Sequence, residues 1–257
     1  MKELLLQINK DKLPNHIGII LDGNGRWAKK RGMPRIFGHK KGIDTLGNIV
    51  KKTKELGIKN LTVFAFSTEN INRPEKEVKF LMEQFILFYK NKYKKLIDNK
   101  TNVKIIGEYD NLPKEVVSAI KDINSYPFNE DSFTFTICFN YGSRKEITNS
   151  VKEISTLVKT GRIKISDINE ELIEKHLYTK DLEPLDLIIR TSGEYRLSNF
   201  LLWQAAYSEF YFTSVHFPDF NEEELYKAII DYQSRNRRFG KIGEEDETKS
   251  NYCNNSL

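Results

Sequence analysis

A carboxylate, two glycines and an arginine follow the first apolar run of the chain. The run Ile17–Leu21 passes directly into Asp22, Gly23, Asn24, Gly25 and Arg26. The glycines would let backbone N–H groups approach a phosphate, and a helix start after them would favour negative charge. Asp22 would repel that phosphate unless a divalent cation lay between them, and Mg²⁺ is commonly held by one or two carboxylates plus phosphate oxygens. The segment is neither a Walker P-loop nor a dinucleotide-binding fingerprint, and the alternative is a turn that only ends a strand.

Two more polar segments follow apolar runs in the same way. The segment 66–73, FSTENINR, offers Ser67, Glu69, Asn70 and Arg73, although an ordinary turn is also rich in Ser and Asn. The segment 189–200, IRTSGEYRLSNF, contributes two arginines and a hydroxyl that could bind phosphate oxygens, namely Arg190, Arg196 and Ser198, with Gly193 allowing close approach. The alternative is that these arginines are solvated charges on the surface and bind no ligand.

Glu209 lies inside the apolar stretch LLWQAAYSEFYFT. A lone carboxylate there is costly unless it is paired or bound to a metal. Glu209 is therefore expected either to form an ion pair or to share a metal ion with Asp22.

Strand-like apolar runs alternate with helix-like periodicities along the chain. This alternation predicts a single α/β domain with a central, mostly parallel six-stranded sheet and helices on both faces. The predicted strands are Ile17–Leu21, Leu61–Phe66, Val103–Ile106, Phe133–Phe139, Leu185–Ile189 and Phe210–Val215, and the predicted helices include 43–56 (with Gly57 as C-cap), 113–124, 144–160, 166–178 and 221–237. Because ligands bind at the carboxyl ends of parallel strands, the polar segments are expected at one edge.

One predicted helix is unusually long. It spans 75–97, or about 35 Å, and carries a broad apolar stripe. The stripe predicts an ordinary core-facing helix, one wall of an elongated apolar cavity, or both. The segment Lys90–Lys95 at its end, KNKYKK, predicts a solvated basic surface that could also meet anionic lipid.

Composition limits the class of protein. The 257 residues carry a net charge of +5, which fits phosphorylated small molecules or a membrane surface better than a nucleic-acid-binding arm. The two cysteines make neither a disulfide framework nor a zinc motif, so a cytoplasmic location is expected. The expected organisation is an amphipathic segment at 1–12, the domain at 13–240 and a disordered polar tail at 241–257. No segment is apolar enough to predict a membrane span.

Five motifs together resemble those of bacterial cis-prenyltransferases, whose best-known members are undecaprenyl diphosphate synthases. The motifs are HIGIILDGNGRWAKKRG, FSTENINRP, NYGSR, RTSGEYRLSNFLLWQ and RRFG, in order over residues 13–240. The resemblance implies an enzyme that condenses isopentenyl diphosphate onto an allylic diphosphate, usually farnesyl diphosphate, forming cis double bonds. It also implies an apolar tunnel for the product, a homodimer and transient contact with membranes.

The resemblance assigns expected roles to individual residues. Asp22 and Glu209 would bind Mg²⁺, and Asn70, with Ser67, would help remove the proton from isopentenyl diphosphate. Arg190, Arg196 and Ser198 would bind isopentenyl diphosphate, and Trp27 would pack beside the allylic chain. The phosphate-binding residues would be Gly23, Asn24, Gly25, Arg26, Arg35, His39 and Arg73, and the neighbouring substrate-binding residues Thr68, Glu69, Ile71 and Leu197. His39 has the alternative of a purely structural hydrogen bond.

The product is expected to be undecaprenyl diphosphate, with a shorter cis-prenyl diphosphate as the alternative. Bulky Phe133 and Phe135 lie on the strand that lines the far end of the tunnel in relatives, and they could shorten the product. The chain departs from the family pattern at Ile71, Ser192 and Tyr195. The stretch LLWQAAYSEFYF is expected at a dimer interface or in the core, and Arg235, Arg237 and Arg238 could reach a partner's diphosphate site.

Three other classes of protein fit the sequence less well. A non-catalytic partner subunit would typically lack the aspartate and the phosphate loop, and this chain has Asp22, Asn24 and Arg26. A trans-prenyltransferase would be all-helical with aspartate-rich motifs, and this chain has no adjacent aspartates. A nucleotide-processing α/β domain would be recognised by competition from nucleotides.

Overall fold

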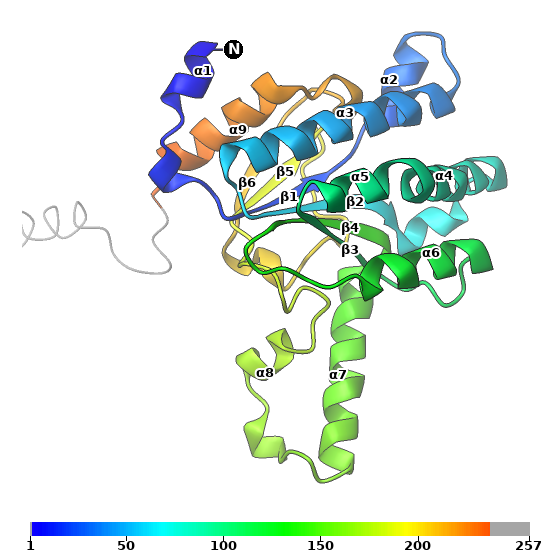
Figure 1. Cartoon of the computed structure of the whole chain (residues 1–257), viewed down its shortest axis with the longest axis vertical. Helices are drawn as coiled ribbons and strands as arrows, with labels where there is room; N and C mark the ends of the chain where they lie inside the picture. The colour runs from blue at the N-terminus through cyan, green and yellow to red at the C-terminus, as the bar shows by residue number, and fades with distance from the viewer. Residues whose placement is uncertain (1, 237–257) are drawn as a thin grey trace, which may run out of the picture.

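Six parallel strands form the centre of the protein. The computed structural model describes residues 2–236, and Figure 1 shows their arrangement. The strands are β1 His16–Ile20, β2 Asn60–Ser67, β3 Thr101–Ile106, β4 Phe133–Tyr141, β5 Leu187–Arg190 and β6 Glu209–Phe212, in the spatial order β3-β4-β2-β1-β5-β6. Every pairing is parallel, and β1 in the middle pairs with β2 and β5. The predicted six-stranded sheet is confirmed.

Alternating residues of each strand pack into two separate hydrophobic clusters, because successive side chains point to opposite faces of a sheet. Ile17 and Ile19 belong to the larger cluster, with residues of helices α3, α4, α6 and α9, and Ile20 belongs to the smaller one with Phe200. Both faces are therefore covered, which explains why the strands read as continuous apolar runs.

The helices follow the predicted order. They are α1 Lys2–Gln7, α2 Asn24–Lys30, α3 Arg35–Leu56, α4 Glu75–Phe88, α5 Lys94–Asp98, α6 Lys114–Ser125, α7 Ser143–Lys159, α8 Glu170–Glu174 and α9 Glu222–Ser234. Short 3₁₀ turns lie at Lys10–Lys12, Thr68–Asn72, Ile165–Asp167, Gln204–Tyr207 and Phe217–Asp219. Gly57 ends α3 with a φ of 91°, a left-handed conformation that favours glycine, as predicted.

The long helix predicted at 75–97 is present but changes its winding. A π-helical turn at Tyr89–Tyr93 joins α4 to α5. The helix predicted at 166–178 is much shorter than expected, because Asn169 adopts an extended conformation and caps α8 by accepting a hydrogen bond from the Leu172 N–H. This segment and α7 form an arm that projects away from the sheet (Figure 1).

The sequence predicts where the domain begins and ends. Helix α1 precedes β1 and packs on α9. The division into 1–12, 13–240 and 241–257 stays a prediction, because the tail at 241–257, Arg237, Arg238 and the RRFG motif lie outside the described residues. Within the described part, no helix combines the length and the apolarity needed to cross a membrane.

Candidate active site

The polar segments after β1, β2 and β5 meet at one edge of the sheet. Ile20 at the end of β1 lies beside Arg190 at the end of β5 and beside Phe64 of β2. Since parallel strands all end at the same edge, the three segments form one polar rim, as predicted. That rim surrounds the opening of a cavity of about 460 Å³.

Asp22 is held between two arginines at this rim. Its carboxylate lies 3.0 Å from the Arg26 guanidinium and 2.9 Å from that of Arg190. Burial alone would raise the pKa of Asp22, but the hydrogen bond from Arg190 and the charge of Arg26 outweigh it and hold the pKa below its usual value. Asp22 is therefore ionised at neutral pH.

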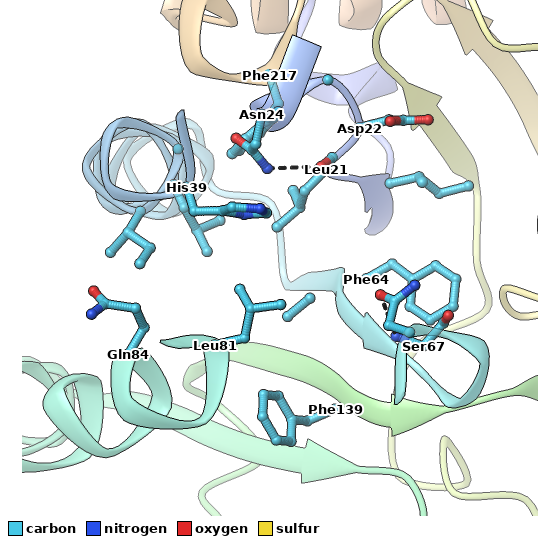
Figure 2. A pocket seen from close by; sticks show the side chains of 18 of the residues that line it. Leu21, Asp22, Asn24, His39, Phe64, Ser67, Leu81, Gln84, Phe139 and Phe217 are labelled. Carbon is cyan, nitrogen blue, oxygen red and sulfur yellow. Dashed lines mark hydrogen bonds between the residues drawn. The ribbon is translucent and has the colours of Figure 1, made fainter. Parts of the chain in front are cut away.

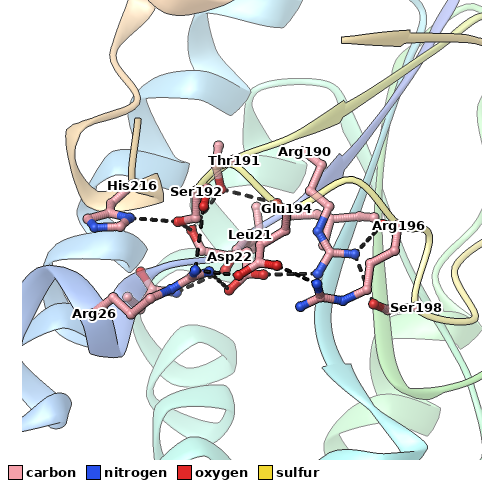
Figure 3. A network of polar contacts seen from close by, with 12 residues as sticks. Leu21, Asp22, Arg26, Arg190, Thr191, Ser192, Glu194, Arg196, Ser198 and His216 are labelled. Carbon is pink, nitrogen blue, oxygen red and sulfur yellow. Dashed lines mark hydrogen bonds and ion pairs between the residues drawn. The ribbon is translucent and has the colours of Figure 1, made fainter. Parts of the chain in front are cut away.

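Glu194 joins the same network, a role that was not predicted from the sequence. Its carboxylate forms ion pairs with both Arg26 and Arg196 (Figure 3). These two hydrogen bonds, the one from Arg196 first, hold the pKa of Glu194 below its usual value. The only signal in the sequence was an acidic residue beside Arg196 in a glycine-containing turn.

Arg190 is almost completely buried, with 3% of its surface exposed. Its Nη1 donates to the Ser198 hydroxyl at 2.8 Å and to the Arg196 carbonyl, and its Nη2 donates to Asp22. Its Nε has no hydrogen-bond partner among the described residues. Because a buried unsatisfied donor is costly, this N–H is available to an anionic oxygen.

The backbone at Asp22 is fixed by three further contacts. Its carbonyl accepts hydrogen bonds from the Thr191 hydroxyl at 2.7 Å, the Ser192 hydroxyl at 3.0 Å and the Phe217 N–H at 3.0 Å. Gly23 follows with a φ of 101°, and a Cβ at this position would lie 1.9 Å from the Ser192 Oγ. Only glycine fits this turn, which explains the Asp-Gly pair.

A second ionic cluster joins α3 to the start of α4, and its two arginines and its histidine line the same cavity. Glu77 lies 3.0 Å from the guanidiniums of Arg35 and Arg73, and 3.2 Å from the His39 Nε2. Burial lowers the pKa of His39, and the Glu77 carboxylate acts in the opposite direction. The sequence predicted Arg35, His39 and Arg73 as phosphate-binding residues but missed Glu77, which holds them together.

The predicted site residues divide into two groups. The cavity is lined by Asp22, Gly23, Asn24, Gly25, Arg26, Arg35, His39, Ser67, Asn70, Arg73, Arg190, Arg196 and Ser198. Trp27, Thr68, Glu69, Ile71 and Leu197 are not among its lining residues. The Trp27 Nε1 instead donates to Asp219 at 2.7 Å, and Glu69 accepts from Asn199 at 3.1 Å.

The interior of the cavity is apolar. Leu81, Phe85 and Phe88 of α4 form one wall, with Ile43 and Leu46 of α3 beside them. Phe135, Ile137 and Phe139 of β4 also line the cavity, and Figure 2 shows Leu81 and Phe139 on one side with His39 on the other. The long helix thus packs on the core and lines a cavity at the same time. Phe133 does not belong to the lining.

Glu209 does not lie near Asp22 in this chain. It is the first residue of β6 and lies beside Leu187 at the start of β5, whereas Asp22 contacts Arg190 at the end of β5. Its carboxylate pairs with Arg235 at 2.8 Å. Within one chain Glu209 therefore forms the ion pair of the alternative, and a metal ion shared by Asp22 and Glu209 stays a prediction.

Among residues 2–236, no group of three or more His, Cys, Asp and Glu side chains could hold a metal ion by itself. The fit to Mg²⁺ therefore depends on Asp22, the carboxylate at the cavity mouth, combined with oxygens of a bound diphosphate. The donor chemistry suits Mg²⁺ because all of these ligands are anionic oxygens.

A charged rim around an apolar cavity defines a protein that binds a molecule with an anionic head and an apolar chain. Comparison with known proteins identifies the family. Residues 20–240 match the prenyltransferase family described as "Putative undecaprenyl diphosphate synthase". The isoprenyl transferase of Clostridium perfringens is 50% identical over 91% of this chain and 92% of its own length, and that of Prochlorococcus marinus is 48% identical over 98% and 93%.

A solved structure shows the same likeness. Lavandulyl diphosphate synthase from Lavandula x intermedia, in complex with dimethylallyl diphosphate, superposes with a TM-score of 0.85 at 36% identity, over 90% of this chain and all of the other. The chain belongs to the undecaprenyl diphosphate synthase family of prenyltransferases. It is an isoprenyl transferase enzyme.

Proposed function

We propose that this enzyme condenses isopentenyl diphosphate with an allylic diphosphate, farnesyl diphosphate being the expected primer, and that it uses Mg²⁺. The product is a cis-polyprenyl diphosphate, with undecaprenyl diphosphate as the leading candidate. The observation that carries the proposal is the position of the Asp22–Arg26–Arg190 network at the mouth of an apolar cavity.

The rim supplies groups for two diphosphates. Arg26 and the turn 22–25 would bind the allylic diphosphate, while Arg190, Arg196 and Ser198 would bind isopentenyl diphosphate. In the reaction the allylic C–O bond breaks, diphosphate leaves, the isopentenyl double bond attacks the allylic carbon, and a proton leaves the isopentenyl unit. Mg²⁺ bound to Asp22 and diphosphate would neutralise charge on the leaving group.

Asn70 is better suited to positioning than to accepting the proton. Its Oδ1 accepts a hydrogen bond from the Ser67 N–H at 3.1 Å, which occupies part of the side chain in a local cap. An amide is also a weak base. The released diphosphate or a water molecule is therefore the proposed proton acceptor, with Asn70 and Ser67 orienting the substrate.

Growth of the chain into the cavity is favourable because burial of each methylene contributes about 0.8 kcal/mol, or about 4 kcal/mol for a five-carbon unit before entropy losses. The cavity wall then limits length. Phe135 lies on that wall, which supports the shorter-product alternative, whereas Phe133 could act only indirectly.

A homodimer is supported by surfaces that a single chain leaves uncovered. Strand β6 is an edge strand, and Val151, Ile165 and Ile168 of the projecting arm are 52%, 75% and 40% exposed. A two-fold axis beside β6 and perpendicular to the sheet would make the two copies of this strand antiparallel. Glu209 of the partner subunit would then lie toward the Asp22 edge, where it could complete the metal site.

Product analysis tests the proposal. Purified protein is incubated with farnesyl diphosphate, labelled isopentenyl diphosphate and Mg²⁺, beside an Asp22→Ala variant. We expect a ladder of products from the wild type, and a loss of about a hundredfold or more in rate for the variant, because an electrostatic contact to the reacting group is removed. A ladder that ends before eleven isoprene units would favour the shorter-chain alternative. No incorporation with any allylic primer would overturn the proposal and favour a partner subunit.

A further inference from the structure

The corner between α2 and α3, residues 29–41, combines basic and apolar side chains on one surface. From Gly23 to Ile43 the sequence holds seven lysines and arginines and no aspartate or glutamate. Figure 1 places α2 and the start of α3 at the opposite end of the molecule from the α7–α8 arm. The corner is thus remote from the arm, one of the two parts of the surface proposed for dimerisation.

Most lysines of this corner have no acidic partner. Lys29, Lys30, Lys40 and Lys41 are exposed and form no ion pair among the described residues. The arginines differ, because Arg31 pairs with Asp219 at 3.2 Å and Arg35 pairs with Glu77 at 3.0 Å. The four lysines therefore present a positive charge that no acidic residue within 2–236 neutralises by an ion pair.

Two large apolar side chains lie among these lysines. Met33 and Phe37 are 42% and 52% exposed, and the Lys40 Nζ lies 5.9 Å from the centre of the Phe37 ring. On α3, Arg35 and His39 line the cavity, and at 100° per residue Phe37 and Lys41 point to the opposite side. One short stretch of helix thus carries the cavity mouth and an exposed basic–apolar face.

The basic segment Lys90–Lys95 lacks this combination. Lys90 pairs with Glu115 at 2.9 Å, and Lys92 lies 3.9 Å from Asp44. Its central aromatic residue, Tyr93, is buried. The segment that the sequence suggested for lipid contact is therefore partly neutralised and offers less apolar surface.

We propose that the α2–α3 corner docks on an anionic lipid bilayer, with Met33 and Phe37 entering the interface and the four lysines contacting lipid headgroups. Interfacial binding requires this pairing of apolar side chains with unneutralised basic residues. The biological use rests on the proposed function, since docking would hold the cavity mouth close to the membrane that receives an apolar product.

Vesicle sedimentation without any prenyl substrate tests this proposal separately from catalysis. The full chain is mixed with vesicles of phosphatidylglycerol and phosphatidylcholine, or of phosphatidylcholine alone. The test variant carries Lys→Gln at 29, 30, 40 and 41, and its matched control carries Lys→Gln at 90, 92, 94 and 95, which removes the same charge. A second pair tests the apolar contacts. The double variant Met33→Ser/Phe37→Ser is compared with the control double variant Leu5→Ser/Leu6→Ser, whose original side chains are also exposed.

Wild-type protein is expected to bind the anionic vesicles and not the neutral ones. The test variant should lose binding by about six-hundredfold, because each of the four lysines strengthens binding to an anionic surface about fivefold, while the charge-matched control keeps most of its binding. Met33→Ser with Phe37→Ser should also weaken binding more than its control. No binding by the wild type, equal losses in test and control variants, or tighter binding to single-stranded RNA than to vesicles would each overturn the proposal.

Discussion

Ser192 adopts a left-handed backbone conformation, with a φ of 77°, which is uncommon for a residue other than glycine. Its hydroxyl donates to the Asp22 carbonyl at 3.0 Å and lies 2.7 Å from the His216 Nδ1. Since the hydroxyl has one hydrogen, His216 must donate from Nδ1 while Ser192 donates to Asp22. Burial lowers the pKa of His216, with Lys30 and Arg26 acting in the same direction, so the ring is neutral at neutral pH.

This geometry predicts that Ser192 and His216 stabilise the protein as a pair. In a double-mutant cycle of Ser192→Gly and His216→Leu, we expect a coupling of about 1 kcal/mol in the free energy of unfolding, measured in urea. Ser192→Gly alone should change stability little, because glycine relieves about 1 kcal/mol of backbone strain while the hydrogen bonds are lost. Thr191→Val also removes a hydrogen bond to Asp22, but its effect should be additive with His216→Leu. Additivity in both cycles would contradict the pairing.

Among the elements, β4 contributes Phe135, Ile137 and Phe139 to the cavity lining. Phe133 and Phe135 are both buried on the same face of this strand, 7% and 2% exposed, but only Phe135 lines the cavity. We expect Phe135→Ala to lengthen the product by at least one isoprene unit and Phe133→Ala to change it less. Product ladders on thin-layer plates measure this.

Both variants lose a large buried side chain, so each is expected to destabilise the fold by about 3–5 kcal/mol. The ladders are therefore compared at a temperature where both variants remain folded by circular dichroism. Unchanged product length in the double variant would exclude β4 as the length-determining element.

The elements were predictable from the sequence because strands buried on both faces leave continuous apolar runs and helices leave amphipathic ones. The three polar segments were predictable as one site because parallel strands share a carboxyl edge. The ion-pair partners of the charged side chains in these segments were not predictable. Glu77 contacts Arg35 only because α4 docks beside α3, and no local spacing encodes that docking, whereas its pair with Arg73 is a local one of four-residue spacing. The apolar neighbours of Glu209 in the sequence indicate that its charge needs a partner, but they do not indicate which end of β6 it occupies.

At the scale of the whole molecule, the proposed dimer makes a specific prediction about mixed subunits. Asp22→Ala and Glu209→Ala should each inactivate a homodimer. A heterodimer of the two, purified through two different tags, should regain about half of the wild-type activity, because one of its two sites then has both intact carboxylates.

The control heterodimer combines Asp22→Ala with Arg26→Ala. Both changes lie in the site of their own subunit, so neither site is intact and activity should stay low. The arrangement would be refuted by an active Glu209→Ala homodimer, or by an inactive mixture of the Asp22 and Glu209 variants.

The ion pairs of Glu194 have a consequence for turnover. Because its carboxylate already pairs with Arg26 and Arg196, a diphosphate in the proposed reaction would enter by exchanging places with that carboxylate. The net gain in binding is then the difference between two sets of ion pairs, which is much smaller than the attraction of a bare cationic cleft. The same carboxylate competes for the arginines when diphosphate must depart. An internal competitor of this kind keeps the charged head exchangeable while the growing apolar chain stays in the cavity.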